Sequence, residues 1–237
     1  MQKKLFGTDG VRGVANHELK GELAFKLGRI GGYYLSKKTE AERPVVIIGK
    51  DTRLSGDMLE AALMAGLTSV GIDVYRLGII PTPGVCYLTR TKEVAGGIMI
   101  SASHNPVQDN GIKFFDKSGF KLTDRQEEQI EEIIFESVDE LPIATGAQVG
   151  KLSYINNSTE QYIDYLKTTI NADFNGLKIV ADTANGAAYE VAPRVLEELG
   201  AEVIALNNQQ TGKNINVDCG STHPEEVQQE VVANNAD

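Results

Sequence analysis

The chain has 237 residues, of which 41% are hydrophobic and 24% are charged, as in an ordinary folded protein with one or two hydrophobic cores. Its formal net charge of -10 argues against general affinity for nucleic acid or anionic lipid, because both require a basic surface. Because of this charge we expect no nucleic-acid partner. No stretch approaches membrane-spanning length, so we also expect no membrane association. Cys86 and Cys219 have no C-x-x-C partner, which favours a reducing, cytoplasmic location over a zinc site or a disulfide framework.

Apolar segments between residues 45 and 101 predict a parallel α/β unit. The short apolar, β-branched run at 45–50 is typical of a buried strand, and 73–80 and 95–101 are predicted to be a second and a third strand. Residues 56–71 have the apolar spacing of a helix, with Ser55 as its candidate cap. Such alternation of strand, helix and strand favours a parallel sheet with right-handed crossovers.

Two amphipathic helices are predicted further along the chain, at 123–137 and 158–170. The first begins with Thr123 and Gln126 in the spacing of a capping box, and the second repeats the device with Ser158 and Gln161. Residues 138–150 between them contain Pro and Gly without a clear period, which predicts a loop or a short strand.

The strand, loop, helix and strand pattern recurs at residues 177–207, where Asp182-Thr183 matches Asp51-Thr52. We therefore expect two repeated α/β domains, at 1–152 and 153–237. A last helix is predicted at 223–237, and in an alternating domain another parallel strand should follow it. The second domain is thus expected to be truncated, as part of a longer chain.

The stretch "ISASHNP" at 100–106 places Ser103 directly after a predicted strand and allows three interpretations. The plainest is a turn, because Ser, Asn and Pro are common loop formers. The second is a serine hydrolase, whose nucleophile elbow needs small residues, normally glycines, two positions to either side of the serine. Here Ser101 and Asn105 occupy these positions and no glycine flanks the loop, so this interpretation has little support. Phosphoryl transfer through a phosphorylated Ser103 is the third.

A phosphoserine carries close to two negative charges, so it needs cations, backbone donors and usually a hard metal ion around it. Four cations lie in or beside glycine-bearing segments that we predict to be loops at strand ends, where ligand sites of parallel sheets collect. They are Arg12, Lys50, Arg53 and Lys113.

Three stretches resemble the α-D-phosphohexomutases: "FGTDGVRG" at 6–13, "GKDTRLSG" at 49–56 and "ISASHNPVQDNGIKFF" at 100–115. The resemblance extends over essentially the whole chain, including 176–188 and 214–225. It implies repeated α/β domains with mixed or parallel sheets. The opening stretch is similar to the bacterial branch of the family that acts on glucosamine phosphates.

The resemblance implies an enzyme that interconverts glucosamine 6-phosphate and glucosamine 1-phosphate, with glucosamine 1,6-bisphosphate as intermediate and activator. The serine that matches Ser103 is the phosphoryl carrier in this family, and its phosphate helps to bind Mg²⁺. The implied catalytic partners of that serine are Arg12, His104 and Lys113. Residues expected to support the phosphate environment are Lys50, Arg53 and Asn110.

The chain departs from the family pattern because it has no acidic D-G-D-G-D metal loop and lacks the loops of the third and fourth domains. We therefore expect no mutase activity from residues 1–237 alone. An incomplete sheet exposes an unpaired edge, so we also expect a homodimer. The alternatives left open are a mutase of mannose or glucose phosphates and a non-catalytic module that binds a phosphosugar.

Overall fold

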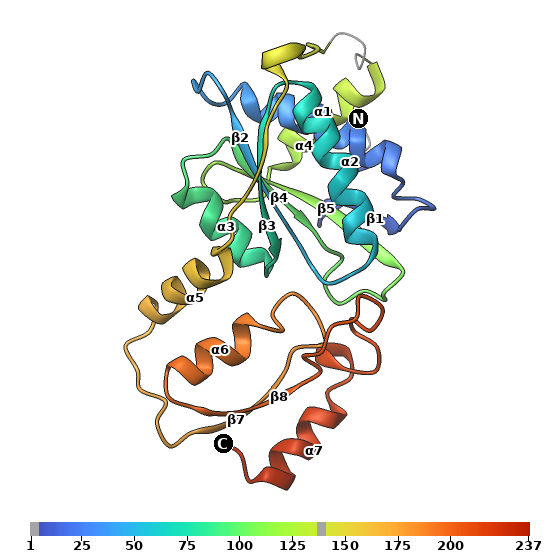
Figure 1. Ribbon diagram of the computed structural model, residues 1–237. Coiled ribbons are helices and arrows are strands. Elements are labelled where there is room, and N and C mark those ends of the chain that lie inside the picture. The colour runs from blue at the N-terminus through green and yellow to red at the C-terminus, as the bar shows by residue number, and fades with distance from the viewer. Residues whose placement is uncertain (1–4, 137–140) are drawn as a thin grey trace.

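Two β-sheets organise the residues that the computed structural model describes, 5–136 and 141–237. The first sheet has six strands in the order β1-β5-β4-β2-β3-β6, and the second pairs β7 with β8. Figure 1 shows the first unit at the top and the second below it, with α5 between them. The expected pair of α/β units is confirmed.

The centre of the first sheet is parallel, as predicted. Strand β2 (Val45–Lys50) pairs in parallel with β3 (Asp73–Ile79) on one side and with β4 (Gly96–Ile100) on the other. Strand β6 (Leu152–Tyr154) extends the sheet beyond β3, also in parallel. The domain boundary expected at 152/153 falls inside this short strand and stays a prediction.

The other edge of the first sheet is antiparallel. Strand β5 (Asp109–Asp116) pairs antiparallel with β4 and with β1 (Val11–Val14). Arg12 and Lys113 therefore lie within strands. Arg12 stands beside the Gly7–Gly10 turn, as expected, but the glycine-bearing segment around Lys113 is the strand β5 and not the loop that we predicted. Glycines suggested loops there, but in strands they allow close approach: a Cβ at Gly111 would lie 2.7 Å from the carbonyl oxygen of Ser101.

Helices cover both faces of the first sheet because the side chains of a strand alternate between its faces. Val46 and Ile48 belong to the core on one face, while Ile47 belongs to the core on the other. The helices on the first face are α1 (Gly21–Ser36), α2 (Ser55–Ser69) and α4 (Asp124–Glu136). Those on the second face are α3 (Thr82–Thr91) and α5 (Ser158–Thr168).

One of the three predicted helix caps is confirmed. The backbone N–H of Thr123 donates to Gln126 Oε1 at 2.8 Å, and the Gln126 N–H reaches Thr123 Oγ1 at 3.4 Å, as in a capping box. Ser55 and Ser158 do not cap their helices, whose N-cap residues are Leu54 and Asn157. Both serines bond across the fold instead, to Asn110 and to the Leu77 carbonyl.

The second unit repeats the order strand, helix, strand that the sequence predicts. Strands β7 (Lys178–Asp182) and β8 (Glu202–Leu206) are parallel, and α6 (Val191–Glu198) connects them. The final helix, α7 (Glu225–Asn234), packs against β7, on the side opposite α6 in Figure 1.

The repeat extends to the Asp-Thr loops. Asp51 Oδ1 accepts the backbone N–H of Arg53 at 3.0 Å, and Asp182 Oδ1 accepts that of Ala184 at 2.8 Å. Each aspartate thus closes the same two-residue turn at the end of its strand.

The predicted end of the α4 helix at 137 and the start of the predicted loop at 138–150 lie outside the described residues. The rest of that loop contains a 3-10 turn, Gly146–Gln148, and a second such turn, Gly220–Thr222, precedes α7. None of the helices in the described ranges combines the length and apolarity that a bilayer crossing requires.

Candidate active site

The serine loop, residues 101–108, connects β4 to β5 at the carboxyl end of the parallel strands. The backbone N–H of Asp51, just after β2, donates to the Ile100 carbonyl at 3.0 Å. The residues that follow β2 therefore lie against the serine loop. This edge is where open α/β sheets bind their ligands.

Ser103 is exposed on this loop and has a left-handed backbone, with φ 56°. That conformation is costly for a residue other than glycine, so the surroundings must hold it. Its N–H donates to Ser101 Oγ at 3.0 Å, and its own Oγ lies 3.5 Å from His104 Nδ1. A serine hydrolase needs an acidic residue that orients its histidine. Across the described ranges no carboxylate hydrogen-bonds to His104, so the hydrolase interpretation is not supported.

Arg12 and Lys113 lie on the neighbouring strands β1 and β5, and Arg12 contacts the serine loop. They share Asp9, which lies 3.3 Å from Arg12 Nη2 and 3.6 Å from Lys113 Nζ. Arg12 Nη1 also donates to Asn105 Oδ1 at 3.3 Å. Burial lowers the pKa of Lys113, and its neighbour Arg12 lowers it further against the opposing effect of Asp9. Two cations with a single exposed carboxylate between them make this side of the loop attractive to an anion.

Arg53 lies behind the serine loop rather than in solvent. Its side chain has no exposed area, and its guanidinium pairs with Asp51, which is itself buried. Nη2 donates to the carbonyl oxygens of Ser103 at 3.2 Å and Asn105 at 2.7 Å. Its charge is thus used to support the loop backbone.

Lys50 stands at the end of β2 with two carboxylate partners. Its Nζ lies 2.8 Å from Glu60 Oε2 and also contacts Asp57. Burial lowers the pKa of Lys50, but the hydrogen bonds with Asp57 and Glu60 outweigh it, so the pKa lies above its ordinary value. Glu60 also pairs with Arg76 at 2.8 Å, which ties β2, α2 and β3 together.

Asn110 is fully buried at the start of β5. Its Nδ2 donates to Ser55 Oγ at 2.9 Å, and its Oδ1 accepts the Gly111 N–H at 2.8 Å. Among the described residues, His104 therefore contacts Ser103 and Arg12 contacts the serine loop at Asn105, whereas Lys113 is joined to them only through Asp9 and Arg12. Arg53 supports the loop from behind, and Asn110 and Lys50 are engaged in other contacts.

Sequence reasoning missed Asn216, which reaches the serine loop from the second unit. Its Nδ2 donates to the carbonyl oxygens of Ser103 at 2.8 Å and Asn105 at 2.9 Å. Asn216 lies within the 214–225 stretch that carries the family resemblance, but an uncharged side chain gave no chemical reason to single it out.

Within residues 5–136 and 141–237, no three His, Cys, Asp or Glu side chains gather closely enough to hold a metal ion. A phosphate on Ser103 would supply oxygen ligands, but Mg²⁺ requires about six. The residues described here do not by themselves form the expected magnesium site.

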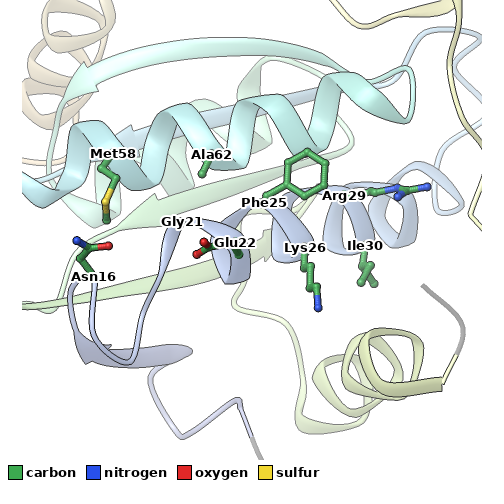
Figure 2. Close-up of a pocket in the computed structure, with 9 residues that line it drawn as sticks. All are labelled: Asn16, Gly21, Glu22, Phe25, Lys26, Arg29, Ile30, Met58 and Ala62. Carbon is green, nitrogen blue, oxygen red and sulfur yellow. The ribbon is translucent and has the colours of Figure 1, made fainter. Parts of the chain in front are cut away.

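A cavity of about 560 Å³ lies away from the serine loop, between α1 and α2. Figure 2 shows Phe25 of α1 beside α2, which contributes Met58 and Ala62 to the lining, while the Arg29 side chain extends away from both. None of the residues predicted for phosphoryl transfer lines this cavity, so it is separate from the candidate active site.

Known proteins resemble this chain over nearly its whole length. A phosphoglucosamine mutase from Desulforamulus reducens is 58% identical over 234 residues, and one from Clostridioides difficile is 56% identical over 237. Each alignment covers 99% of this chain and 52% of the relative, so the chain spans about half the length of these curated relatives.

A solved structure of a phosphoglucomutase/phosphomannomutase family protein from Burkholderia thailandensis superposes with a TM-score of 0.82 at 27% identity. It matches 98% of this chain and 51% of its own. The family model for the α/β/α domain I of phosphoglucomutase/phosphomannomutase matches residues 3–140, more than half of the chain. The chain therefore belongs to the phosphoglucomutase/phosphomannomutase family, with a domain I of the phosphohexomutase type followed by part of a domain II.

Proposed function

We propose that this chain is the phosphoserine-bearing part of a phosphoglucosamine mutase, which interconverts glucosamine 6-phosphate and glucosamine 1-phosphate. The observation that carries the proposal is the geometry of Ser103, which is exposed on a loop that Arg53 supports and Arg12 contacts at Asn105. Lys113 lies next to Arg12, and both contact Asp9. The sugar is proposed from the relatives, because those of 56% and 58% identity are named phosphoglucosamine mutases.

In the proposed reaction a sugar phosphate hydroxyl attacks the phosphorus on Ser103. The new oxygen–phosphorus bond forms as the bond to Ser103 Oγ breaks. The sugar hydroxyl loses one proton and Ser103 Oγ gains one, so that the serine leaves as a neutral hydroxyl. This produces glucosamine 1,6-bisphosphate, whose other phosphoryl group then returns to Ser103. His104 Nδ1, 3.5 Å from Ser103 Oγ, is the nearby group that can assist proton movement at that oxygen.

The protein contributes mainly position and charge to such a transfer. Arg12 and Lys113 would stabilise the negative charge on the moving phosphoryl group. The family generally uses Mg²⁺, and the phosphate on Ser103 is the part of its coordination that the described residues would supply.

Covalent labelling tests the role of Ser103 in the full-length protein. We expect radiolabelled glucosamine 1,6-bisphosphate to transfer phosphate to the wild-type protein and peptide mass spectrometry to locate it on residues 101–109. Ser103→Ala should abolish the labelling. Ser118→Ala, in the exposed turn after β5, is the matched control and should retain it. Labelling that persists in Ser103→Ala, or a wild type that takes up no label, would contradict the proposal.

A phosphomannomutase or phosphoglucomutase is the second candidate, which the likeness to the Burkholderia thailandensis family member favours. Labelling rates with glucose and mannose 1,6-bisphosphates distinguish it from the first. A non-catalytic phosphosugar-binding module would instead bind the bisphosphates without forming a covalent product.

A further inference from the structure

The carbonyl oxygens of Ser103 and Asn105 each accept two hydrogen bonds from outside the serine loop. One comes from Arg53 in the first unit, at 3.2 and 2.7 Å. The other comes from Asn216 in the second unit, at 2.8 and 2.9 Å. The same two oxygens are thus clamped by two side chains that are 163 positions apart in the sequence (216 − 53).

Ser103 is a residue whose backbone needs such a clamp. Its φ of 56° is left-handed, and a non-glycine residue persists there when surrounding contacts stabilise that conformation. The Ser103 carbonyl belongs to the peptide that precedes His104, and the Asn105 carbonyl belongs to the peptide that follows Asn105. Hydrogen bonds that hold both oxygens therefore fix the orientation of these two peptide planes. The direction in which Ser103 Oγ leaves the backbone then depends on both donors.

Asn216 is held firmly enough to act as a donor of this kind. Its own backbone is left-handed, with φ 57°, and its N–H donates to the Ala184 carbonyl at 3.0 Å. Two more bonds join the units beside it: Thr52 Oγ1 to the Asn185 carbonyl at 2.6 Å, and the Leu54 N–H to the Gly212 carbonyl at 3.2 Å. Figure 1 shows the β4–β5 connection meeting the loops of the second unit at this point.

We propose that Asn216 is a positioning residue for phosphoryl transfer, through which the second unit sets the orientation of Ser103. The inference rests on the proposed function and adds to it a requirement that the second unit be docked for the serine to react. Arg53 cannot meet this requirement alone, because it belongs to the same unit as the serine loop. Asn216 touches the loop backbone and not the serine hydroxyl, so its effect is on rate through geometry.

The test compares two glycine variants at matched positions in the full-length protein. Asn216→Gly removes the two hydrogen bonds while keeping a residue that tolerates a left-handed backbone. Asn207→Gly makes the same change at φ 48°, where the side chain donates to Glu226 on α7 and, among the described residues, has no contact with the serine loop. Both variants gain the same freedom in the unfolded state, so their difference isolates the contact with the serine loop.

We expect the maximal rate of labelling by glucosamine 1,6-bisphosphate to fall about 100-fold in Asn216→Gly, the size expected for a misplaced reacting group. The bisphosphate concentration at half-maximal rate should change little. Asn207→Gly should label at the wild-type rate. Asn216→Asp, which has no donor to offer, should behave like Asn216→Gly. A wild-type rate in Asn216→Gly, or an equal loss in both glycine variants, would overturn the inference.

Hydrogen exchange separates a failure of this inference from a failure of the proposed function. Amides of residues 101–109 should exchange faster in Asn216→Gly than in Asn207→Gly, whether or not Ser103 accepts phosphate. An unlabelled wild type with this exchange difference would refute phosphoryl transfer and leave the clamp standing. Equal exchange in the two variants would refute the clamp itself.

Discussion

A buried ion pair supports the serine loop. Asp51 and Arg53 are both 2% exposed, and they pair directly beneath the loop. Desolvating two charges is costly, and the pair regains that cost only because both partners are present and further hydrogen-bonded. Asp51 accepts the Arg53 N–H, and Arg53 donates to two loop carbonyls, so removing either side chain leaves unpaired buried groups.

Replacing Arg53 by Met tests this pair. We expect the variant to lose about 3 to 5 kcal/mol of unfolding free energy, because the Asp51 carboxylate is left buried and uncompensated. Urea unfolding followed by circular dichroism measures the loss. The double variant Asp51→Asn/Arg53→Met should be less destabilised than Arg53→Met, because no charge is stranded. If the double variant lost as much unfolding free energy as Asp51→Asn and Arg53→Met lose together, the pairing would contribute nothing to stability.

Among the helices, α1 and α2 approach closely because each places a glycine at the contact. A Cβ at Gly28 would lie 2.3 Å from the Leu63 carbonyl oxygen, and one at Gly66 would lie 2.2 Å from that of Phe25. Both distances are far below van der Waals contact, so no side chain fits unless the helices separate. The closely packed α1 and α2 cover one face of the sheet together with α4.

Gly66→Ala should destabilise the protein although alanine favours helices by about 1 kcal/mol over glycine. Overpacking a tight contact costs about 1 to 3 kcal/mol or more, which outweighs the propensity gain. Gly21→Ala in the first turn of α1 is the control, because a Cβ there has open space around it. Thermal unfolding should show a lower midpoint for Gly66→Ala and an unchanged or slightly higher one for Gly21→Ala. The opposite ranking would mean that the helices can move apart freely.

At the scale of the whole molecule, residues of both units meet at the serine loop. The serine loop and its cations belong to the first, whereas Asn216 and the carbonyls that anchor Thr52 and Leu54 belong to the second. The chain still spans only about half the length of its curated relatives. The expected homodimer stays a prediction.

We expect purified residues 1–237 to show no conversion of glucosamine 6-phosphate to glucosamine 1-phosphate. The physical reason is that the described residues supply too few oxygen ligands for Mg²⁺ around a phosphoserine. A coupled assay of product formation makes the measurement, with the Ser103→Ala chain purified in parallel to report contaminating host enzyme. Turnover that is present in the wild-type chain and absent from Ser103→Ala would contradict this expectation.

Local patterns predicted much of the fold. The β-branched runs of β2, β3 and β4 and the periodicity of α2 are properties of a few neighbouring residues, so they could be predicted without knowing the partners. The Thr123–Gln126 cap formed for the same reason, since both residues belong to one helical turn. Ser55 and Ser158 do not cap their helices because their hydroxyl groups hydrogen-bond to distant residues, Asn110 and Leu77.

The sequence by itself determined the alternation of strands and helices and the repeated Asp-Thr turns, because each depends on spacing along the chain. Ser103 was selected as the residue to test by the resemblance of its loop to that of the phosphohexomutases. Only the tertiary structure decided that Arg12 and Lys113 stand on antiparallel strands and that Arg53 is buried. It alone brought Asn216 to the serine loop, across 113 residues of sequence. Contacts of that range arise when two units pack together, and no local pattern encodes which amide will meet which carbonyl.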